Sequence, residues 1–343
     1  MRNAMLQSLQ MSIREMRMNR FATGLTFVIF ATLTGSGTWA QAWKPTRNVE
    51  IIVGSAAGGG ADLTARLMQR IMREKLGLDF PSTVVNKTGG GSSLSYVFLN
   101  QHPGDAHYIA LSLQPMITGP MMIAGQIPYT DMTPLAHLFN EYVGFAVRAD
   151  SSIKSGRDLV ERLRKDPGAV SFSLSTALAG SNHLATVLAL KSAGVDIKKL
   201  RVVVVAGANE SIAGVMGGHV DVMATSAASQ IAHIQGGKLR GIAVSGPRRL
   251  GGAFAEVPTW KEQGMDSVYA NWRGVVGPKG MNAAQIAYWD DAFSRLAQTP
   301  EWRNEALRLL QDPVYMNSQE TRRFLDAQHQ ELRAVLVELG LAK

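Results

Sequence analysis

The chain has 343 residues, of which 46% are hydrophobic and 18% are charged, and it contains no cysteine. This length and apolar fraction are typical of a folded protein with about two domains. The absence of cysteine excludes disulfide scaffolds, zinc ribbons, iron–sulfur clusters, thiol catalysis and a lipid-modified N-terminal cysteine. The formal net charge of +8 is, taken alone, compatible with binding to nucleic acid or to a membrane surface.

The first 42 residues carry much of that charge. Arg14, Arg17 and Arg20 precede an apolar stretch at 21–33, and small residues then end in Ala40-Gln41-Ala42. This order is typical of a cleavable secretory signal peptide. The apolar stretch is shorter than the ~20 residues that a membrane-spanning helix needs. We therefore predict a signal peptide at 1–42 and an exported protein.

The charge that remains after export does not favour nucleic acid. Removing residues 1–42 takes away four arginines and one glutamate, so the formal net charge falls to +5. The other lysines and arginines are scattered, and no basic stripe with interleaved aromatic residues occurs. We expect no nucleic-acid binding, and the mild positive charge suits an anionic ligand.

After residue 42, apolar runs typical of strands alternate with helical patterns. Strands are predicted at 49–53, 83–85, 108–113, 142–147, 170–174, 200–205, 220–224 and 239–244. Helices are predicted at 61–76, 156–164, 183–192, 210–216, 229–234, 284–298 and 320–339. The alternation predicts an α/β protein with parallel sheets covered on both faces. Because no strand follows the last helices, we expect these to pack on a sheet formed earlier in the chain.

The most informative segment joins the first predicted strand to the first predicted helix. It contains Gly54, small residues at 55–57 and glycines at 58–60, and Asp62 follows. Small side chains let a ligand approach the backbone, and the N–H groups at a helix start favour an anion. The alternative is a tight turn without a ligand. Asp62 is also placed to serve the helix itself, as an N-cap or first-turn acid.

Phosphate-binding motifs do not fit this segment. A P-loop needs a lysine and a hydroxyl residue where Gly60-Ala61 stand, and a dinucleotide fingerprint begun at Gly58 would place Leu63 at its last glycine. A neutral cradle of backbone amides remains, which suits a carboxylate or a similar small anion. We predict no cofactor.

Two later loops have a similar composition. The loop at 86–93 contains three glycines and two serines, and the loop at 172–183 is rich in hydroxyl groups and enters a helix near His183. Loops at the carboxyl ends of strands are the usual ligand sites of open α/β sheets. His183 could hydrogen-bond the helix start, contact a ligand or act in catalysis. The seven histidines show no short metal-ligand spacing and no G-x-S-x-G elbow occurs, so we predict neither a metal site nor a catalytic residue.

Taken in order, these segments resemble the Bug family, the periplasmic substrate-binding proteins of tripartite tricarboxylate transporters. The run at 58–62 resembles the family's P-G-G-x-x-D segment, and 86–91 resembles its N-[RK]-P-G-x-G segment. Further matches follow in the family's order at 175–184, 217–223, 237–244, 257–259 and 271–274. Each match is weak alone, but their order over more than two hundred residues is specific.

The resemblance implies a type II periplasmic-binding-protein fold, in which two α/β lobes are joined by crossover strands and hold a ligand in the cleft between them. It places lobe 1 at 43–143 and 266–343, and lobe 2 at 144–265. It also implies ligand contacts at the strand ends of both lobes, with Trp272 near the cleft, in the hinge or in the core. Carried over position by position, these contacts are Ser55, Ala57, Gly58, Gly59, Asp62, Leu113, Gln114, Ser175, Thr176, Ala177, Gly180, Ser181, His183, Thr225 and Ser226.

Some positions depart from the family pattern. Small residues at 55–57 replace prolines and an aromatic residue, Thr225 stands where many members carry an aspartate, and Val205-Ala206 replaces a common Tyr-Lys pair. These changes alter the charge that the site prefers, so the resemblance does not specify which carboxylate binds.

The resulting hypothesis is a monomeric periplasmic protein, not an enzyme, that captures a small carboxylate by hinge closure of its lobes. Its expected partners are the membrane subunits of a tripartite tricarboxylate transporter, or a sensor protein. Two alternatives stay open: an exported α/β enzyme acting on a small anion, and a ligand-presenting sensor partner without a role in transport.

Overall fold

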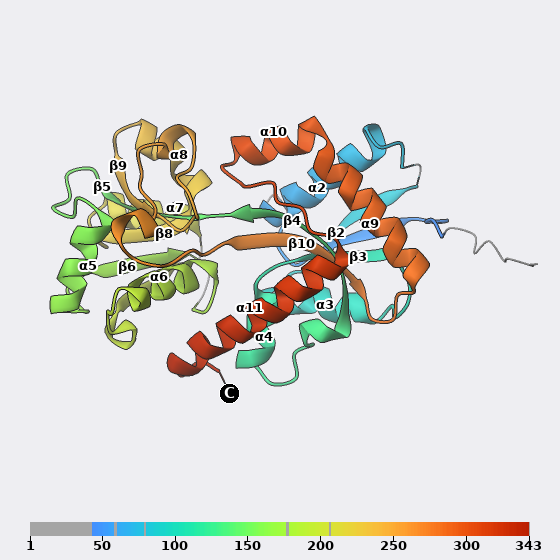
Figure 1. Cartoon of the computed structure of the whole chain (residues 1–343), viewed down its shortest axis with the longest axis horizontal. Coiled ribbons are helices and arrows are strands. Elements are labelled where there is room, and N and C mark those ends of the chain that lie inside the picture. The colour runs from blue at the N-terminus through green and yellow to red at the C-terminus, as the bar shows by residue number, and fades with distance from the viewer. Residues whose placement is uncertain (1–42, 58–59, 79, 176–177, 206, 343) are drawn as a thin grey trace, which may run out of the picture. The chain divides into compact units, whose positions relative to one another are not determined.

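The computed structural model describes residues 43–57, 60–78, 80–175, 178–205 and 207–342. The predicted signal peptide at 1–42 lies outside these residues. The described residues form two five-stranded sheets with helices packed on them (Figure 1). The strand order is β2-β1-β3-β10-β4 in the first sheet and β7-β6-β8-β5-β9 in the second.

Most of the strands are rich in apolar residues and are five or six residues long. Those of the first sheet are β1 (Val49–Val53), β2 (Ser82–Asn86), β3 (Tyr108–Ser112), β4 (Met132–Glu141) and β10 (Asn271–Pro278). Those of the second sheet are β5 (Val143–Arg148), β6 (Ser171–Ser175), β7 (Arg201–Val205), β8 (Val222–Ser226) and β9 (Leu239–Val244).

Both sheets are mixed, so the expectation of parallel sheets was wrong. In the first sheet β10 is antiparallel to both of its neighbours, β3 and β4. In the second sheet β5 is antiparallel to both β8 and β9. In each sheet the reversed strand is the one that arrives from the other sheet, since β5 follows β4 and β10 follows β9 in the chain. The other strands pair in parallel, β1 with β2 and β3, and β6 with β7 and β8, as the βαβ pattern indicated.

The chain crosses between the two lobes along adjacent strands. Tyr142 alone separates the end of β4 from the start of β5. Along its length β10 pairs with β4, with Asn271 opposite Glu141 at one end and Pro278 opposite Met132 at the other. Figure 1 shows these two strands side by side, extending from the first sheet toward the second.

The helices cover the sheets and include several with apolar faces toward the strands. They are α2 (Gly60–Glu74), α3 (Ser93–Asn100), α4 (Pro115–Met122), α5 (Gly156–Lys165), α6 (Ser181–Ser192), α7 (Ala208–Met216), α8 (Ala227–Gln235), α9 (Ala283–Gln298), α10 (Pro300–Arg308) and α11 (Ser318–Glu338). Short 3-10 turns are η1 (Gly90–Ser92), η2 (Tyr129–Asp131), η3 (Ile197–Lys199), η4 (Gly252–Phe254) and η5 (Lys261–Gln263). Within the described residues, no helix combines the length and the apolar character required to cross a bilayer.

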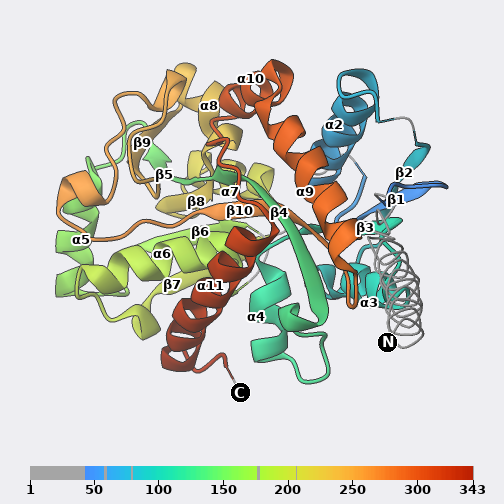
Figure 2. The ribbon, with the colours of Figure 1, turned by 45° about the vertical axis from the view of Figure 1, so that its right-hand side comes forward.

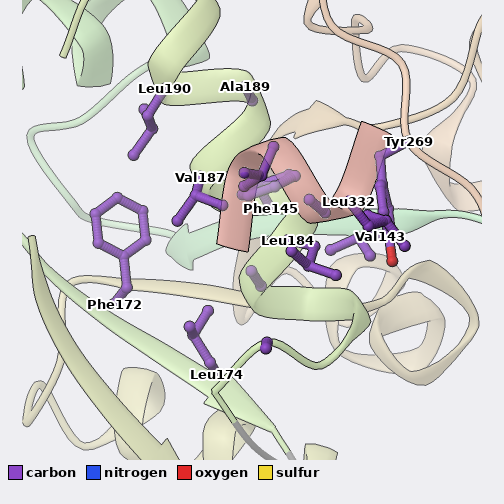
Figure 3. Close-up of a cluster of buried hydrophobic side chains, with 14 of the residues drawn as sticks. Val143, Phe145, Phe172, Leu174, Leu184, Val187, Ala189, Leu190, Tyr269 and Leu332 are labelled. Atoms are coloured by element: carbon purple, nitrogen blue, oxygen red, sulfur yellow. The ribbon is translucent and has the colours of Figure 1, made fainter. Parts of the chain in front are cut away.

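The C-terminal helix α11 links the cores of the two lobes. It runs beside α4 and α6 (Figure 2). Leu332 of α11 belongs to the buried cluster formed by Phe145 of β5, Phe172 of β6 and Leu184 of α6 (Figure 3). At the end of the helix, Glu338 forms an ion pair with Lys191 of α6. The packing of α11 on an existing sheet and helix is what the sequence predicted for the C-terminal helices.

The predicted elements agree with the structure to within two residues at their ends, and β1 and β9 agree at both ends. The two crossing strands β4 and β10 were missed. Pro134 breaks the apolar pattern of β4, and the pairing of β4 with β10 shifts register beside it, between Val275 and Val276. A bulge at that point accommodates the proline, whose missing N–H would interrupt a regular ladder.

Candidate functional site

A cavity of about 500 Å³ lies between the two lobes, where strands of both sheets end. Its lining combines small residues, hydroxyl groups and amides with a few apolar and charged side chains. The described residues that line it are Gly60, Thr64, Gly91, Ser92, Leu113, Gln114, Pro115, Phe139, Glu141, Tyr142, Val143, Gly180, Ser181, Asn182, Ala208, Ser226, Asn271, Arg273 and Gln311. A volume of this size suits a small metabolite.

Helix starts converge on this cavity. The first residue or the N-cap residue of α2, α3, α4, α6, α7 and α8 lies in its wall. At the last five of these helices no side chain of the described residues caps the helix start. The partial positive charge of a helix N-terminus favours an anion. The cavity is therefore built to attract negative charge with backbone groups.

The first glycine loop is held against the second by a close backbone approach. A Cβ atom at Gly54 would lie 2.5 Å from Cβ of Ser92, so any other residue would push the two loops apart. Asn86 Nδ2 donates hydrogen bonds to the carbonyl of Ser55 (2.9 Å) and to Asp62 Oδ1 (3.0 Å). Asp62 lies in the first turn of α2 with its side chain buried, and it helps to fix the loop.

The second glycine loop needs its glycines for conformational reasons. Gly89, Gly90 and Gly91 have φ angles of 125°, 56° and 63°, and Ser92 follows with a φ of 80°. Side chains rarely tolerate such angles, which glycine adopts freely. This run of left-handed residues brings Gly91 and Ser92 to the cavity wall.

The third loop enters α6. Ser175 ends β6 opposite Val205 of β7, and Gly180 is the N-cap residue of α6. His183 is buried, and its Nδ1 accepts a hydrogen bond from the backbone N–H of Ala179 at 3.0 Å. Burial lowers the pKa of His183, which favours the neutral imidazole that can accept this bond.

A polar network connects the cavity wall across the crossing strands. Asn271 Oδ1 accepts hydrogen bonds from Ser181 Oγ and from Arg273 Nη1, both at 2.8 Å. Asn271 Nδ2 donates to Glu141 Oε2 at 3.0 Å, and Ser226 Oγ donates to Glu141 Oε1. Ser181 and Ser226 belong to the second lobe, whereas Asn271 and Glu141 belong to the crossing strands. The network therefore links the second lobe to the crossing strands at the cavity wall.

The cavity carries one charge of each sign. Among the described residues that line it, Arg273 is the one cation and Glu141 the one carboxylate, with Arg273 Nη2 at 3.4 Å from Glu141 Oε2. Gln114 of the first lobe also reaches across, donating from Nε2 to the carbonyl of Ala179 at 3.3 Å. In the described part of the chain no group of three or more histidine or acidic side chains is arranged to hold a metal ion.

The structure brings part of the predicted contact set to the cavity. The predicted residues that line it are Leu113, Gln114, Gly180, Ser181 and Ser226. The predicted residues with described side chains that lie outside the lining are Ser55, Ala57, Asp62, His183 and Thr225. Of these, Thr225 is fully buried and accepts a hydrogen bond from Gln230 Nε2 at 3.1 Å. Gly58, Gly59, Thr176 and Ala177 lie outside the described residues.

Sequence reasoning missed the charged pair of the cavity. Glu141 ends β4 and Arg273 lies on β10, the two strands that were not predicted. Once 271–278 is known to be a strand, alternation puts Asn271 and Arg273 on one face and Trp272 on the other. Trp272 is accordingly buried, with its ring against Phe324 at 5.6 Å between centroids.

Two α/β lobes that enclose a cavity lined by helix starts define a two-lobed solute-binding protein. Comparison with protein families agrees: residues 64–341 match the tripartite tricarboxylate transporter family receptor, TctC. The chain belongs to this family of periplasmic transport receptors, which are binding proteins rather than enzymes. The predicted family, fold and general function are thereby confirmed.

Individual relatives cover most of the chain. It is 29% identical over 306 residues to the UPF0065 protein in the gbd 5′ region of Cupriavidus necator, an alignment that covers 89% of this chain and 91% of the relative. It is 25% identical over 302 residues to Protein BugT of Bordetella pertussis, covering 86% of this chain and 90% of the relative.

Solved structures share the fold. A TctC solute-binding protein from Polaromonas matches with a TM-score of 0.73 at 24% identity, covering 86% of this chain and 99% of the other. An R. palustris protein solved with adipate matches with a TM-score of 0.74 at 21% identity (87% and 99% covered). MatC from Rhodopseudomonas palustris, solved with bound malate, matches with a TM-score of 0.69 at 20% identity (85% and 99% covered).

Proposed function

We propose that this receptor captures a small carboxylate in the cavity between its lobes and delivers it to the membrane subunits of a tripartite tricarboxylate transporter. The observation that carries the proposal is the convergence of uncapped helix starts on a cavity of about 500 Å³. Relatives solved with adipate and malate support the same ligand class.

Capture proceeds in two steps in this proposal. The carboxylate docks on the glycine loops of lobe 1 (43–143 and 266–343), and lobe 2 (144–265) then closes over it. The proposed contacts are those predicted from the sequence, and the five that line the cavity are the first to test. Charge-assisted hydrogen bonds contribute roughly 1.5–3 kcal/mol each, so three or four of them support micromolar affinity, about −8 kcal/mol, after ordering costs.

The cellular setting belongs to the same proposal. The receptor acts as a monomer in the periplasm, after removal of residues 1–42 as a signal peptide. N-terminal sequencing of protein recovered from the periplasm should begin at Trp43. A start at Met1 would contradict cleavage without affecting the binding proposal.

A thermal-shift screen of the exported protein tests ligand capture. The ligands are adipate, malate, succinate and benzoate, with the amide of each acid as its matched control. A bound acid at ~100 times its dissociation constant should stabilise the protein by about 2.7 kcal/mol, while its amide should not. Equal shifts for acids and amides, or no shift with any acid of the panel, would contradict the proposal.

A further inference from the structure

Arg273 is held at the cavity wall by one side of its guanidinium group. Nη1 donates hydrogen bonds to Asn271 Oδ1 (2.8 Å) and to the carbonyl of Trp272 (3.1 Å). The side chain is 16% exposed, so it is largely removed from water. These bonds fix the plane of the guanidinium group relative to β10.

The other edge of the guanidinium group is poorly satisfied. Within the described part of the chain, Nη2 has a single hydrogen bond, to Glu141 Oε2 at 3.4 Å, which is long for a charge-assisted hydrogen bond. Among the described residues, Nε donates no hydrogen bond. Nε and Nη2 form the side-on fork of arginine, whose two parallel N–H bonds match the two oxygens of a carboxylate.

Glu141 does not satisfy this fork because other groups hold its oxygens. Ser226 Oγ donates to Oε1, and Asn271 Nδ2 donates to Oε2 at 3.0 Å. The carboxylate is therefore oriented by its neighbours and approaches Arg273 at one oxygen. It lowers the positive potential at the fork and contacts only Nη2, at the long distance of 3.4 Å.

We infer that Arg273 is a specificity-determining residue that receives the ligand's carboxylate on its Nε/Nη2 edge, and that Glu141 is a positioning residue that tempers this attraction. The inference rests on the proposed function and names the side chain that binds the ligand's carboxylate. Because Glu141 lies beside the fork, this end of the cavity accepts one carboxylate group and disfavours a second one next to it.

An ordinary structural ion pair makes a different prediction. If the pair served the fold alone, removing either partner would weaken ligand binding or leave it unchanged. If Arg273 binds the ligand's carboxylate, removing the negative charge of Glu141 must strengthen ligand binding. The two ends of the pair should therefore affect affinity in opposite directions.

The test measures the dissociation constant by titration calorimetry, using whichever of adipate, malate, succinate and benzoate binds the wild-type protein. Arg273→Met should weaken binding at least tenfold, and Arg273→Lys, which keeps the charge but not the fork, should weaken it by a smaller factor. Glu141→Gln keeps the volume and an oxygen for Ser226, and it should tighten binding about threefold. Arg248→Met is the matched control, because Arg248 is exposed and pairs with Asp312 elsewhere; its affinity should equal that of the wild type.

The outcomes separate this inference from the proposed function. A wild-type protein that binds none of the acids would overturn both. A wild-type protein that binds, together with Arg273→Met and Arg273→Lys proteins that bind equally well, would overturn the role of Arg273 alone. Weaker binding by a Glu141→Gln protein that melts at the wild-type temperature would identify the pair as structural and overturn the inference.

Discussion

The helices of this receptor begin in two different ways, according to where they start. Helices that begin away from the cavity have a side chain that caps the first turn: Ser155 for α5, Asn282 for α9, Thr299 for α10 and Asn317 for α11. At the cavity, α3, α4, α6, α7 and α8 have no side-chain cap from the described residues, although the residues at their starts include hydroxyl and amide groups.

Ser226 illustrates the difference. It is the N-cap residue of α8 and has the hydroxyl group that usually serves as a cap, but that hydroxyl donates to Glu141 instead. A side-chain cap contributes roughly 1 kcal/mol to stability. The cavity helices forgo this contribution and keep their N-termini available for an anion. Outer helix starts thus serve the stability of the fold, and under the proposed function the cavity helix starts serve binding.

Adding an acidic cap to a helix start at the cavity should have the largest effect, a loss of ligand affinity. Gly207 is the N-cap residue of α7, its backbone is extended, and a Cβ atom there would meet no atom of the described residues within 4 Å. In Gly207→Asp the new carboxylate should take the N–H groups of α7 and repel the ligand's carboxylate. A lost charge-assisted hydrogen bond plus repulsion amounts to about 3 kcal/mol, so we expect affinity to fall about 100-fold by calorimetry.

The stability of the same variant supplies the second half of the test. An aspartate cap should raise the free energy of unfolding by a few tenths of a kcal/mol relative to glycine. Gly207→Ser, a cap without charge, should lose less affinity. If Gly207→Asp binds as tightly as the wild type, the start of α7 is not part of the site.

Acid should lower stability through a residue outside the cavity lining. His137 lies on β4 with Asn140, Trp272 and Phe324 against its ring, and burial lowers its pKa to about 4. Its pKa in the unfolded chain is about 6.5. Between these two values the unfolded chain binds a proton that the folded protein does not, so stability falls as the pH falls.

The expected loss between pH 6.5 and pH 4 is about 3 kcal/mol, with no further contribution from His137 below pH 4. Urea unfolding at several pH values measures it. In His137→Gln, the free energy of unfolding should fall by about 3 kcal/mol less over this pH range. Burial also lowers the pKa of His183, but His183 contributes equally in both proteins, so its effect cancels in the comparison. Parallel curves for the two proteins would show that His137 titrates normally.

Much of the fold could be predicted from the sequence because most strands are short segments rich in apolar residues. β1 and β9 were predicted with the correct ends, since apolar residues make up most of each strand and glycine or polar residues flank them. The crossing strands β4 and β10 contain prolines and glycines, and their polar residues Glu141, Asn271 and Arg273 line the cavity. Their pattern is set by tertiary contacts, and local periodicity could not reveal it.

The candidate site shows the same limit. The loop at 172–183 was singled out because small and hydroxyl residues cluster where its strand ends, and Ser181 within it was predicted as a contact from the family resemblance. Glu141 and Arg273 are 132 positions apart in the chain, and only the pairing of β4 with β10 brings them together. A charged pair of this kind has no local signature in a single sequence.

Removing the cap of an outer helix should have the smallest effect, and that effect should be on stability and not on ligand affinity. Asn317 Oδ1 accepts from the backbone N–H of Glu320, and Glu320 Oε2 accepts from the N–H of Asn317, which forms a complete capping box. Asn317→Ala should lower the free energy of unfolding by about 1 kcal/mol, measured by urea denaturation. Carboxylate affinity at saturating folded protein should stay within a factor of two, because α11 begins outside the cavity lining. A larger loss of affinity would mean that α11, which packs on both lobes, couples its first turn to the cavity. Helix starts that serve stability would then not be separate from helix starts that serve binding.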